Sequence, residues 1–63
     1  GMRPMEYLAR KRISEAKRLL SSTGRSVAEI AELTGYRDPT YFGAVFRRYE
    51  GTTPTEYRRT RML

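Results

Sequence analysis

Helix start signals recur along this chain of 63 residues and divide it into short segments. Ser26-Val27-Ala28-Glu29 has the pattern of a capping box, in which a serine hydroxyl and a glutamate carboxylate accept hydrogen bonds from amides at a helix start. Thr53-Pro54-Thr55-Glu56 repeats the pattern, and Asp38-Pro39 combines a carboxylate cap with a proline in the first turn. Helices are therefore predicted to start at residues 26, 38 and 53.

A longer helix is predicted ahead of these, over residues 4–22. Its apolar residues fall at three- and four-residue steps with cations between them, as in an amphipathic helix: Met5, Leu8, Ile13, Ala16, Leu19 and Leu20. Pro4 suits the first turn because proline has no amide hydrogen to leave unsatisfied there. The polar segment 21–25 includes a glycine and is expected to end the helix.

Apolar stripes indicate which faces of the later helices turn inward. The third helix carries one stripe at positions i, i+3, i+4 and i+7, namely Phe42, Val45, Phe46 and Tyr49. The inward face of the second helix is Val27, Ile30, Ala31 and either Leu33 or Thr34. Gly35 and Gly51 are expected to end helices in the left-handed conformation, and Tyr36 to turn inward. No stretch alternates with period two, so the fold class is predicted as all-α, a small helical bundle.

The amino-acid composition favours some classes of function and argues against others. Thirteen Lys and Arg against seven Asp and Glu give a net charge of +6, which favours an anionic partner or simply a solvated cationic face. His, Cys and Trp are absent, which argues against metal sites, cofactors and the commonest catalytic pairs, so an enzyme is not expected. No apolar run reaches the ~20 residues of a membrane span, and no leader is evident, so a cytoplasmic protein without membrane contact is expected.

Two short helices joined by a tight turn resemble a helix-turn-helix. Ala31 and Gly35 are four residues apart, and small residues there let two helices approach closely while glycine makes the turn. Any small helical bundle also uses alanine and glycine at close crossings. Spacing alone therefore leaves both interpretations open.

The pattern G-x-x-P-x-E-Y occurs twice, at residues 1–7 and 51–57. The second copy directly follows a predicted helix and begins the next one. If the first copy has the same meaning, a related unit precedes residue 1. Common helix-start chemistry explains such a match equally well, because proline followed by glutamate suits the start of any helix.

Four ordered segments are family-specific. They are Y-L-x-x-x-R-I-x-x-A-x-x-L-L over 7–20, S-V-x-E-I-A-x-x-x-G-Y over 26–36, D-P-x-Y-F-x-x-x-F-R-R over 38–48 and G-x-T-P-x-x-Y-R over 51–58. Together they closely resemble the AraC/XylS family of bacterial transcriptional regulators. The resemblance implies a DNA-binding domain with two helix-turn-helix units joined by a long helix. Residues 4–22 would be this connector, 26–50 the second, homeodomain-like unit and 53–61 a C-terminal helix, with the effector or dimerisation domain outside the chain.

The resemblance also implies contact residues for double-stranded DNA. The helix after Asp38 would enter the major groove, and the expected contacts are Ser26, Arg37, Pro39, Thr40, Gly43, Ala44, Arg47 and Arg48. Arg47 is the leading candidate, because a guanidinium forks onto guanine or grips a phosphate. Alternatively, Arg47 is only a solvated helix-end cation and Ser26 only a cap. Arg12 is expected to pack or form a salt bridge within the bundle.

Two departures from the family pattern bear on function. Gly43 and Ala44 stand where relatives often carry polar or basic residues, so base reading is expected to be sparse and to use DNA shape. Arg3 replaces a Ser or Thr before the proline, which removes a side-chain cap worth about 1 kcal/mol. The favoured function is sequence-specific DNA binding within a regulator. The alternative is a helical protein-interaction module that contacts a partner such as RNA polymerase through its basic face.

Overall fold

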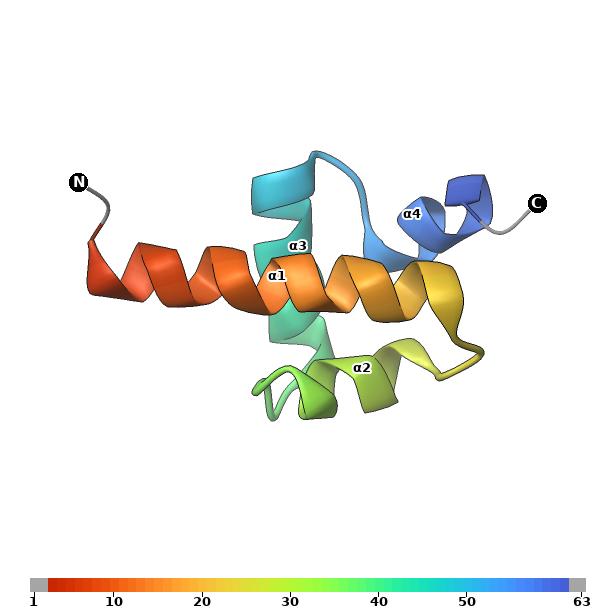
Figure 1. Ribbon diagram of the computed structural model, residues 1–63, viewed down its shortest axis with the longest axis horizontal. Coiled ribbons are helices and arrows are strands. Elements are labelled where there is room, and N and C mark those ends of the chain that lie inside the picture. Colours follow the sequence, from red (N-terminus) through yellow and green to blue (C-terminus); the bar gives the residue numbers. More distant parts are fainter. Residues whose placement is uncertain (1–2, 62–63) are drawn as a thin grey trace.

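The computed structural model describes residues 3–61, which form four helices and no strand (Figure 1). They are α1 (Pro4–Ser22), α2 (Val27–Leu33), α3 (Pro39–Glu50) and α4 (Pro54–Arg61). The prediction of an all-α bundle is therefore confirmed. Gly1, which begins the first copy of the repeated pattern, lies outside the described residues.

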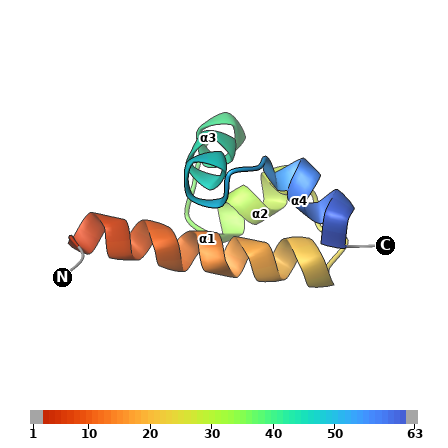
Figure 2. The same cartoon turned by 90° about the horizontal axis from the view of Figure 1, so that it is seen from above.

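Helix α1 is the longest element, and the other three helices gather on one side of it (Figure 2). Helix α3 crosses α1 at a steep angle, while α2 and α4 lie toward the C-terminal end of α1 (Figure 1). The N-terminal turns of α1 extend beyond the bundle, which gives the molecule extents of 36 × 21 × 17 Å.

The predicted caps are present in the structure. The Glu29 amide donates to the Ser26 hydroxyl oxygen at 3.1 Å, and the Ser26 amide donates to the Glu29 carboxylate at 3.2 Å. The Thr40 amide donates to the Asp38 carboxylate at 2.9 Å, which starts α3. A second capping box starts α4, whereas the cap residue of α1, Arg3, makes no side-chain cap. Each start signal in the sequence thus fixes where a helix begins.

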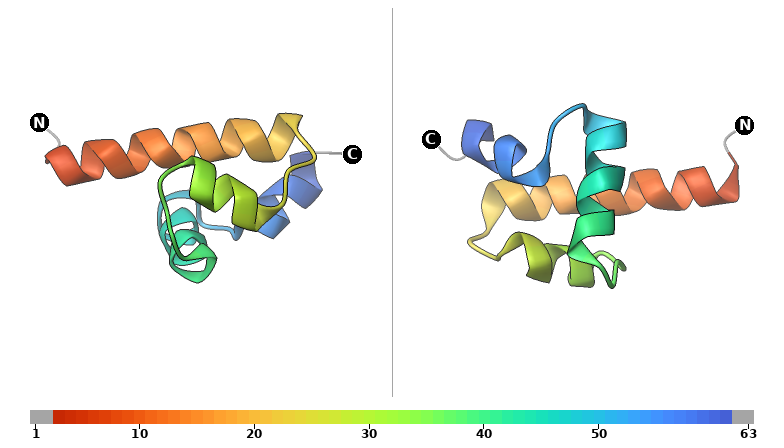
Figure 3. Two further views of the ribbon diagram at one scale, coloured as in Figure 1. Left: turned by 90° about the horizontal axis from the view of Figure 1, so that it is seen from below. Right: turned by 180° about the vertical axis from the view of Figure 1, so that it is seen from behind.

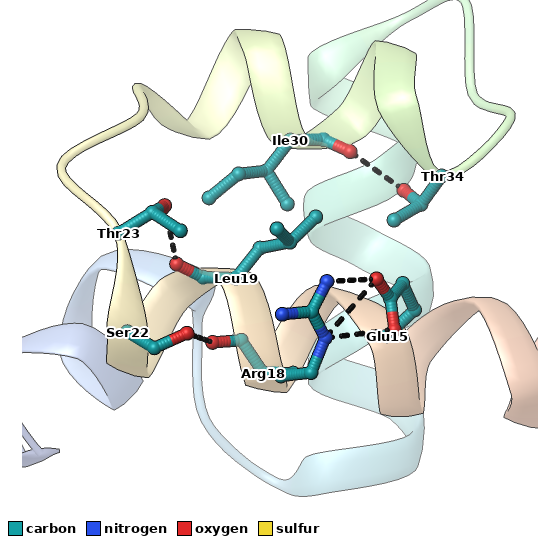
Figure 4. A network of polar contacts seen from close by, with 7 residues as sticks. All are labelled: Glu15, Arg18, Leu19, Ser22, Thr23, Ile30 and Thr34. Carbon is teal, nitrogen blue, oxygen red and sulfur yellow. Dashed lines mark hydrogen bonds and ion pairs between the residues drawn. The ribbon is translucent and has the colours of Figure 1, made fainter.

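The core lies where α1 meets the other helices. Its buried residues are Ile13, Ala16, Leu19, Leu20, Ile30, Ala31, Tyr36, Phe42 and Phe46. Val45 and Tyr49, predicted as core, are only half-buried, because they lie at the margins of the α3 stripe and pack against the cluster. The sequence left Leu33 or Thr34 open, and the structure buries Thr34 and leaves Leu33 57% exposed. The Thr34 hydroxyl donates to the Ile30 carbonyl at 2.7 Å, which satisfies it inside the core (Figure 4).

The N-terminal part of the α1 stripe is not covered. Met5 is 78% exposed and Leu8 is 40% exposed, although both continue the apolar pattern of the buried residues. The pattern predicted an inward face correctly from Ile13 onward. Met5 and Leu8 continue that pattern beyond the bundle, because α2, α3 and α4 do not cover this end of α1 (Figure 2).

Both predicted helix stops have the expected backbone. Gly35 has φ 100° and Gly51 has φ 78°, values that residues with a Cβ rarely adopt. The Tyr36 amide then donates to the Ala31 carbonyl at 2.8 Å, so the chain turns sharply after α2. This turn brings Tyr36 into the core and sets the start of α3.

Candidate nucleic-acid interface

Most of the predicted contact residues gather on the outer face of α3. Phe42 and Phe46 are fully buried and hold the opposite face against the bundle. With 3.6 residues per turn, Thr40, Ala44 and Arg47 point away from that stripe. The predicted contact residues that are exposed on or just before α3 are Arg37, Pro39, Thr40, Ala44, Arg47 and Arg48. In the view from behind, α3 lies in front of α1 and no described helix covers it (Figure 3).

Gly43 lies in the middle of α3 at the edge of this face. A methyl group at its Cα would meet no atom of another side chain or element within 4 Å, so the space beyond the backbone is open. Glycine inside a helix is about 1 kcal/mol less favourable than alanine. Gly43 therefore leaves the backbone of α3 without a covering side chain at this point and weakens the helix slightly.

Arg12 on α1 packs against the turn between α2 and α3. The Arg12 guanidinium lies 5.4 Å from the centroid of the Tyr36 ring and packs directly against Gly35. Burial raises the pKa of the Tyr36 hydroxyl, and the Arg12 charge opposes part of that rise. Arg12 is thus engaged inside the bundle, as expected from the sequence, and anchors the turn that sets the start of α3.

Several other cations form ion pairs or ring contacts within the bundle, away from the outer face of α3. Lys17 pairs with Glu50 at 3.1 Å, and Arg10 lies 5.1 Å from the centroid of the Tyr49 ring. Arg18 donates to the Glu15 carboxylate, with its Nε 3.1 Å from the nearer oxygen (Figure 4). These contacts join α1 to the end of α3 or stay within α1, so they use positive charge for structure.

Three cations beside the outer face of α3 have no such use. Within residues 3–61, no ion pair or cation–π contact involves Arg37, Arg47 or Arg48. Arg47 is close enough to Glu56 to lower the pKa of that carboxyl slightly, although hydrogen bonding by Thr53 is the larger cause. The charges at α3 are therefore available to an anion from outside.

Ser26 is also exposed, at the start of α2. Its hydroxyl oxygen accepts from the Glu29 amide, and its hydroxyl hydrogen has no acceptor among the hydrogen bonds of the described residues. The neighbouring Arg25 pairs with Glu29 at 3.5 Å. The structure therefore shows the capping role of Ser26, while a phosphate contact stays a prediction.

Sequence reasoning missed a shallow groove between α3 and the N-terminal part of α1. Its apolar lining includes Met5, Leu8, Tyr41 and Val45, and Arg48 lies beside them. Tyr41 is 61% exposed and 6.0 Å from Tyr36, centroid to centroid. The one sequence signal for this groove was the apolar pattern that α1 continues to Met5, beyond the bundle.

Neither a metal-binding cluster nor a membrane-spanning helix occurs within residues 3–61. These residues contain no group of three His, Cys, Asp or Glu side chains placed to hold a metal ion. Across the same range, no helix combines the length and the apolar character that a membrane crossing requires.

Comparison with known proteins places this geometry in a family. A family model described as a helix-turn-helix domain matches residues 1–60. The uncharacterized HTH-type transcriptional regulator YisR of Bacillus subtilis is 51% identical over 59 residues, which are 94% of this chain and 21% of that protein. The HTH-type transcriptional activator RhaR of Mannheimia succiniciproducens is 47% identical over 84% of this chain and 19% of its own length. The chain spans about a fifth of the length of these relatives.

Solved structures agree with the sequence relatives. The C-terminal domain of AraT, a response regulator from Geobacillus stearothermophilus, matches all of this chain and 52% of its own with a TM-score of 0.97 and 40% identity. The DNA-binding domain of AdpA, a global transcriptional factor solved with a target DNA, matches 95% of this chain and 54% of its own with a TM-score of 0.91 and 37% identity. With a matching family model over nearly its whole length, the chain belongs to the AraC/XylS-type family of helix-turn-helix domains.

Proposed function

We propose that this chain binds double-stranded DNA sequence-specifically as part of a transcriptional regulator, with α3 entering the major groove. The observation that carries the proposal is the division of α3 into a buried stripe of Phe42 and Phe46 and an uncovered face beside three arginines that form no ion pair within residues 3–61. The relatives named as transcriptional regulators, and the similar AdpA domain solved with DNA, support it.

Roles within the interface follow from side-chain chemistry. Arg47 lies on the exposed side of α3 opposite the buried stripe and is assigned to guanine or a phosphate. Arg37, just before α3, and Arg48, in its last turn, are assigned to phosphates. The smaller contact residues Pro39, Thr40, Gly43 and Ala44 would face the groove floor, and Ser26 would donate to a phosphate at the edge. Among these smaller residues only Thr40 has a hydroxyl, so base reading depends strongly on Arg47 and on DNA shape.

The proposal extends to the organisation of the whole regulator. Residues 4–22 would connect this unit, residues 26–50, to a related helix-turn-helix unit upstream, and residues 53–61 would close the bundle. The exposed Met5, Tyr7 and Leu8 support it, because apolar residues on several sides of α1 favour a second body around that end. An effector or dimerisation domain would lie outside the chain. A regulator that acts on bacterial DNA would work in the cytoplasm.

A contact with RNA polymerase through another basic surface is the second candidate. Arg59 and Arg61 on α4 are exposed and lie on a different helix from the proposed recognition residues. Such a contact and DNA binding are compatible within one regulator. The two are distinguished by their residues, because a polymerase contact would depend on Arg59 and Arg61, whereas DNA binding would depend on Arg47 and release counterions from phosphates.

Salt titration of DNA binding tests the proposed function. Fluorescence anisotropy would follow the wild-type chain, Arg47→Ala and the charge-matched control Arg18→Ala, whose cation lies on α1 and is paired with Glu15. Log Kobs for the wild type should fall with log salt by about 0.9 per phosphate contacted. Arg47→Ala should weaken binding by about 1–3 kcal/mol if it forks onto a base, or lower the slope by about one if it holds a phosphate. Equal binding by both variants would contradict the placement of α3 in the groove.

A further inference from the structure

Nothing in the structure of this bundle requires glycine at position 43. Gly35 and Gly51 have left-handed backbone conformations that glycine favours, and Gly24 lies in the loop after α1. Gly43 instead lies inside α3 without a positive φ. Backbone conformation therefore does not require glycine at this position.

Packing does not require it either. A Cβ at position 43 would have nothing within 4 Å, whereas a Cβ at Gly35 would lie 2.9 Å from the Arg12 Nε. Alanine would fit at position 43 and would strengthen the helix. Within this bundle, glycine at position 43 therefore lowers stability. No packing contact depends on the absence of its side chain.

The position of Gly43 on α3 suggests an external reason. It lies three residues after Thr40 and four before Arg47, so half-buried Gly43 shares one side of the helix with these two exposed residues. Thr40 and Arg47 carry most of the hydrogen-bonding capacity on that side. Arg37 and Arg48, which form no ion pair within the described residues, lie beside it, and the similar AdpA domain was solved with a target DNA.

We propose that Gly43 is a specificity-determining residue at which the backbone of α3 touches DNA directly. Glycine is suited to such close approach because it has no Cβ to hold a ligand away. The missing side chain lets α3 lie deeper in the major groove, and this depth brings Thr40 and Arg47 within reach of base edges. The inference rests on the proposed function, because it requires α3 to be the recognition helix.

Gly43→Ala should move stability and specific DNA binding in opposite directions. A methyl group at position 43 raises helix propensity, so the midpoint of thermal unfolding of the 63-residue chain should rise by roughly 4–8 °C. The same methyl group pushes α3 outward, so affinity for the cognate duplex should fall by roughly 5- to 150-fold, the range of one lost base contact. Affinity for random duplex at low salt should change less than about 3-fold, because phosphate contacts tolerate a small displacement.

The test uses the full regulator that contains this chain and a duplex selected by the wild type from a random pool. Anisotropy on cognate and random duplexes would compare wild type, Gly43→Ala and Gly43→Leu. Ser14→Ala is the matched control, since it also raises helix propensity but lies exposed on α1, outside the interface. A graded loss of specific affinity from Ala to Leu, with Ser14→Ala binding like wild type, is the expected result.

Three other outcomes count against the inference, and they are distinguishable. Unchanged specific affinity in a stabilised Gly43→Ala protein means that Gly43 is an incidental surface residue, while the proposed function stands. A lower unfolding midpoint in Gly43→Ala means that the glycine serves the fold. Absence of any duplex selected by the wild type contradicts the proposed function itself.

Discussion

The guanidinium of Arg12 on α1 covers both Gly35 and the ring of Tyr36, 5.4 Å from the ring centroid. Gly35 makes the turn between α2 and α3, and Tyr36 is 93% buried beside it, with 7% of its surface exposed. One side chain of the long helix therefore fixes the point from which the exposed helix α3 departs.

Removing this contact should destabilise the bundle. Arg12→Ala is expected to cost about 1 kcal/mol, within the range measured for a cation over an aromatic ring, and to lower the unfolding midpoint by roughly 4–8 °C. Arg12→Lys keeps the charge but loses the planar group, so an intermediate midpoint is expected. Thermal unfolding followed by circular dichroism measures both. A midpoint for Arg12→Ala equal to that of the wild type would show that the stacked arginine does not hold the turn.

A second arginine joins α4 to the C-terminal end of α1. Arg58 on α4 donates to the Leu20 carbonyl and to the Thr23 carbonyl, both at 3.2 Å, and so satisfies acceptors at the end of α1. Arg58→Met should lose about 1–3 kcal/mol of unfolding free energy, because a charged donor to partly buried carbonyls is removed. Arg59→Met, one residue away and exposed, should change it by less than about 0.5 kcal/mol. Urea unfolding of the two variants makes the comparison, and equal losses would contradict the capping role of Arg58.

The capping box of α4 predicts a pH dependence. Hydrogen bonds from Thr53, first its backbone amide, lower the pKa of the Glu56 carboxyl below its ordinary value. Because the folded-state pKa is the lower one, the stabilisation is present above the unfolded pKa of about 4.3 and is lost as pH falls through the folded value. Glu56→Gln should therefore flatten the loss of stability below about pH 5.

The control for this experiment is Glu32→Gln, which removes an exposed carboxylate that makes no side-chain hydrogen bond or ion pair within residues 3–61. Unfolding midpoints between about pH 3 and 6 would be compared for the three proteins. If Glu56→Gln and wild type lose stability in parallel over this range, the capping hydrogen bonds do not favour the ionised form.

The orientation of α2 gives a prediction about two neighbouring apolar residues. Ile30 is fully buried, whereas Leu33 is 57% exposed although it is equally apolar. Ile30→Ala should cost about 2–5 kcal/mol through lost burial and a cavity, and Leu33→Ala less than about 0.5 kcal/mol. Chemical unfolding distinguishes them, and a large cost for Leu33→Ala would mean that α2 is rotated from the described position.

Local features of the fold were predictable because their causes are local. Ser26, Asp38 and Thr53 cap helices through partners two or three residues away, and those partners can be read from the sequence. The stripe that buries Phe42 and Phe46 follows from helix periodicity alone.

Features that depend on distant segments were not predictable. Arg58 bonds to carbonyls 35 and 38 residues away, and no sequence spacing announces such a pair. The apolar pattern of α1 could not show that the neighbouring helices leave Met5 and Leu8 uncovered. Periodicity indicates which side of a helix is apolar, but not how far the neighbouring helices extend along it. For the candidate interface, the sequence named the exposed residues of α3, whereas the absence of local partners for Arg37 and Arg48 required the structure.

The central claim is that the uncovered face of α3 is the surface that meets DNA. Titration of the ¹⁵N-labelled 63-residue chain with duplex DNA at low salt tests it directly through amide chemical shifts. The largest changes are expected between Arg37 and Arg48, with smaller ones near Ser26 and little change along the C-terminal half of α1. Changes concentrated on α4 or on the N-terminal turns of α1, with α3 unaffected, would contradict it.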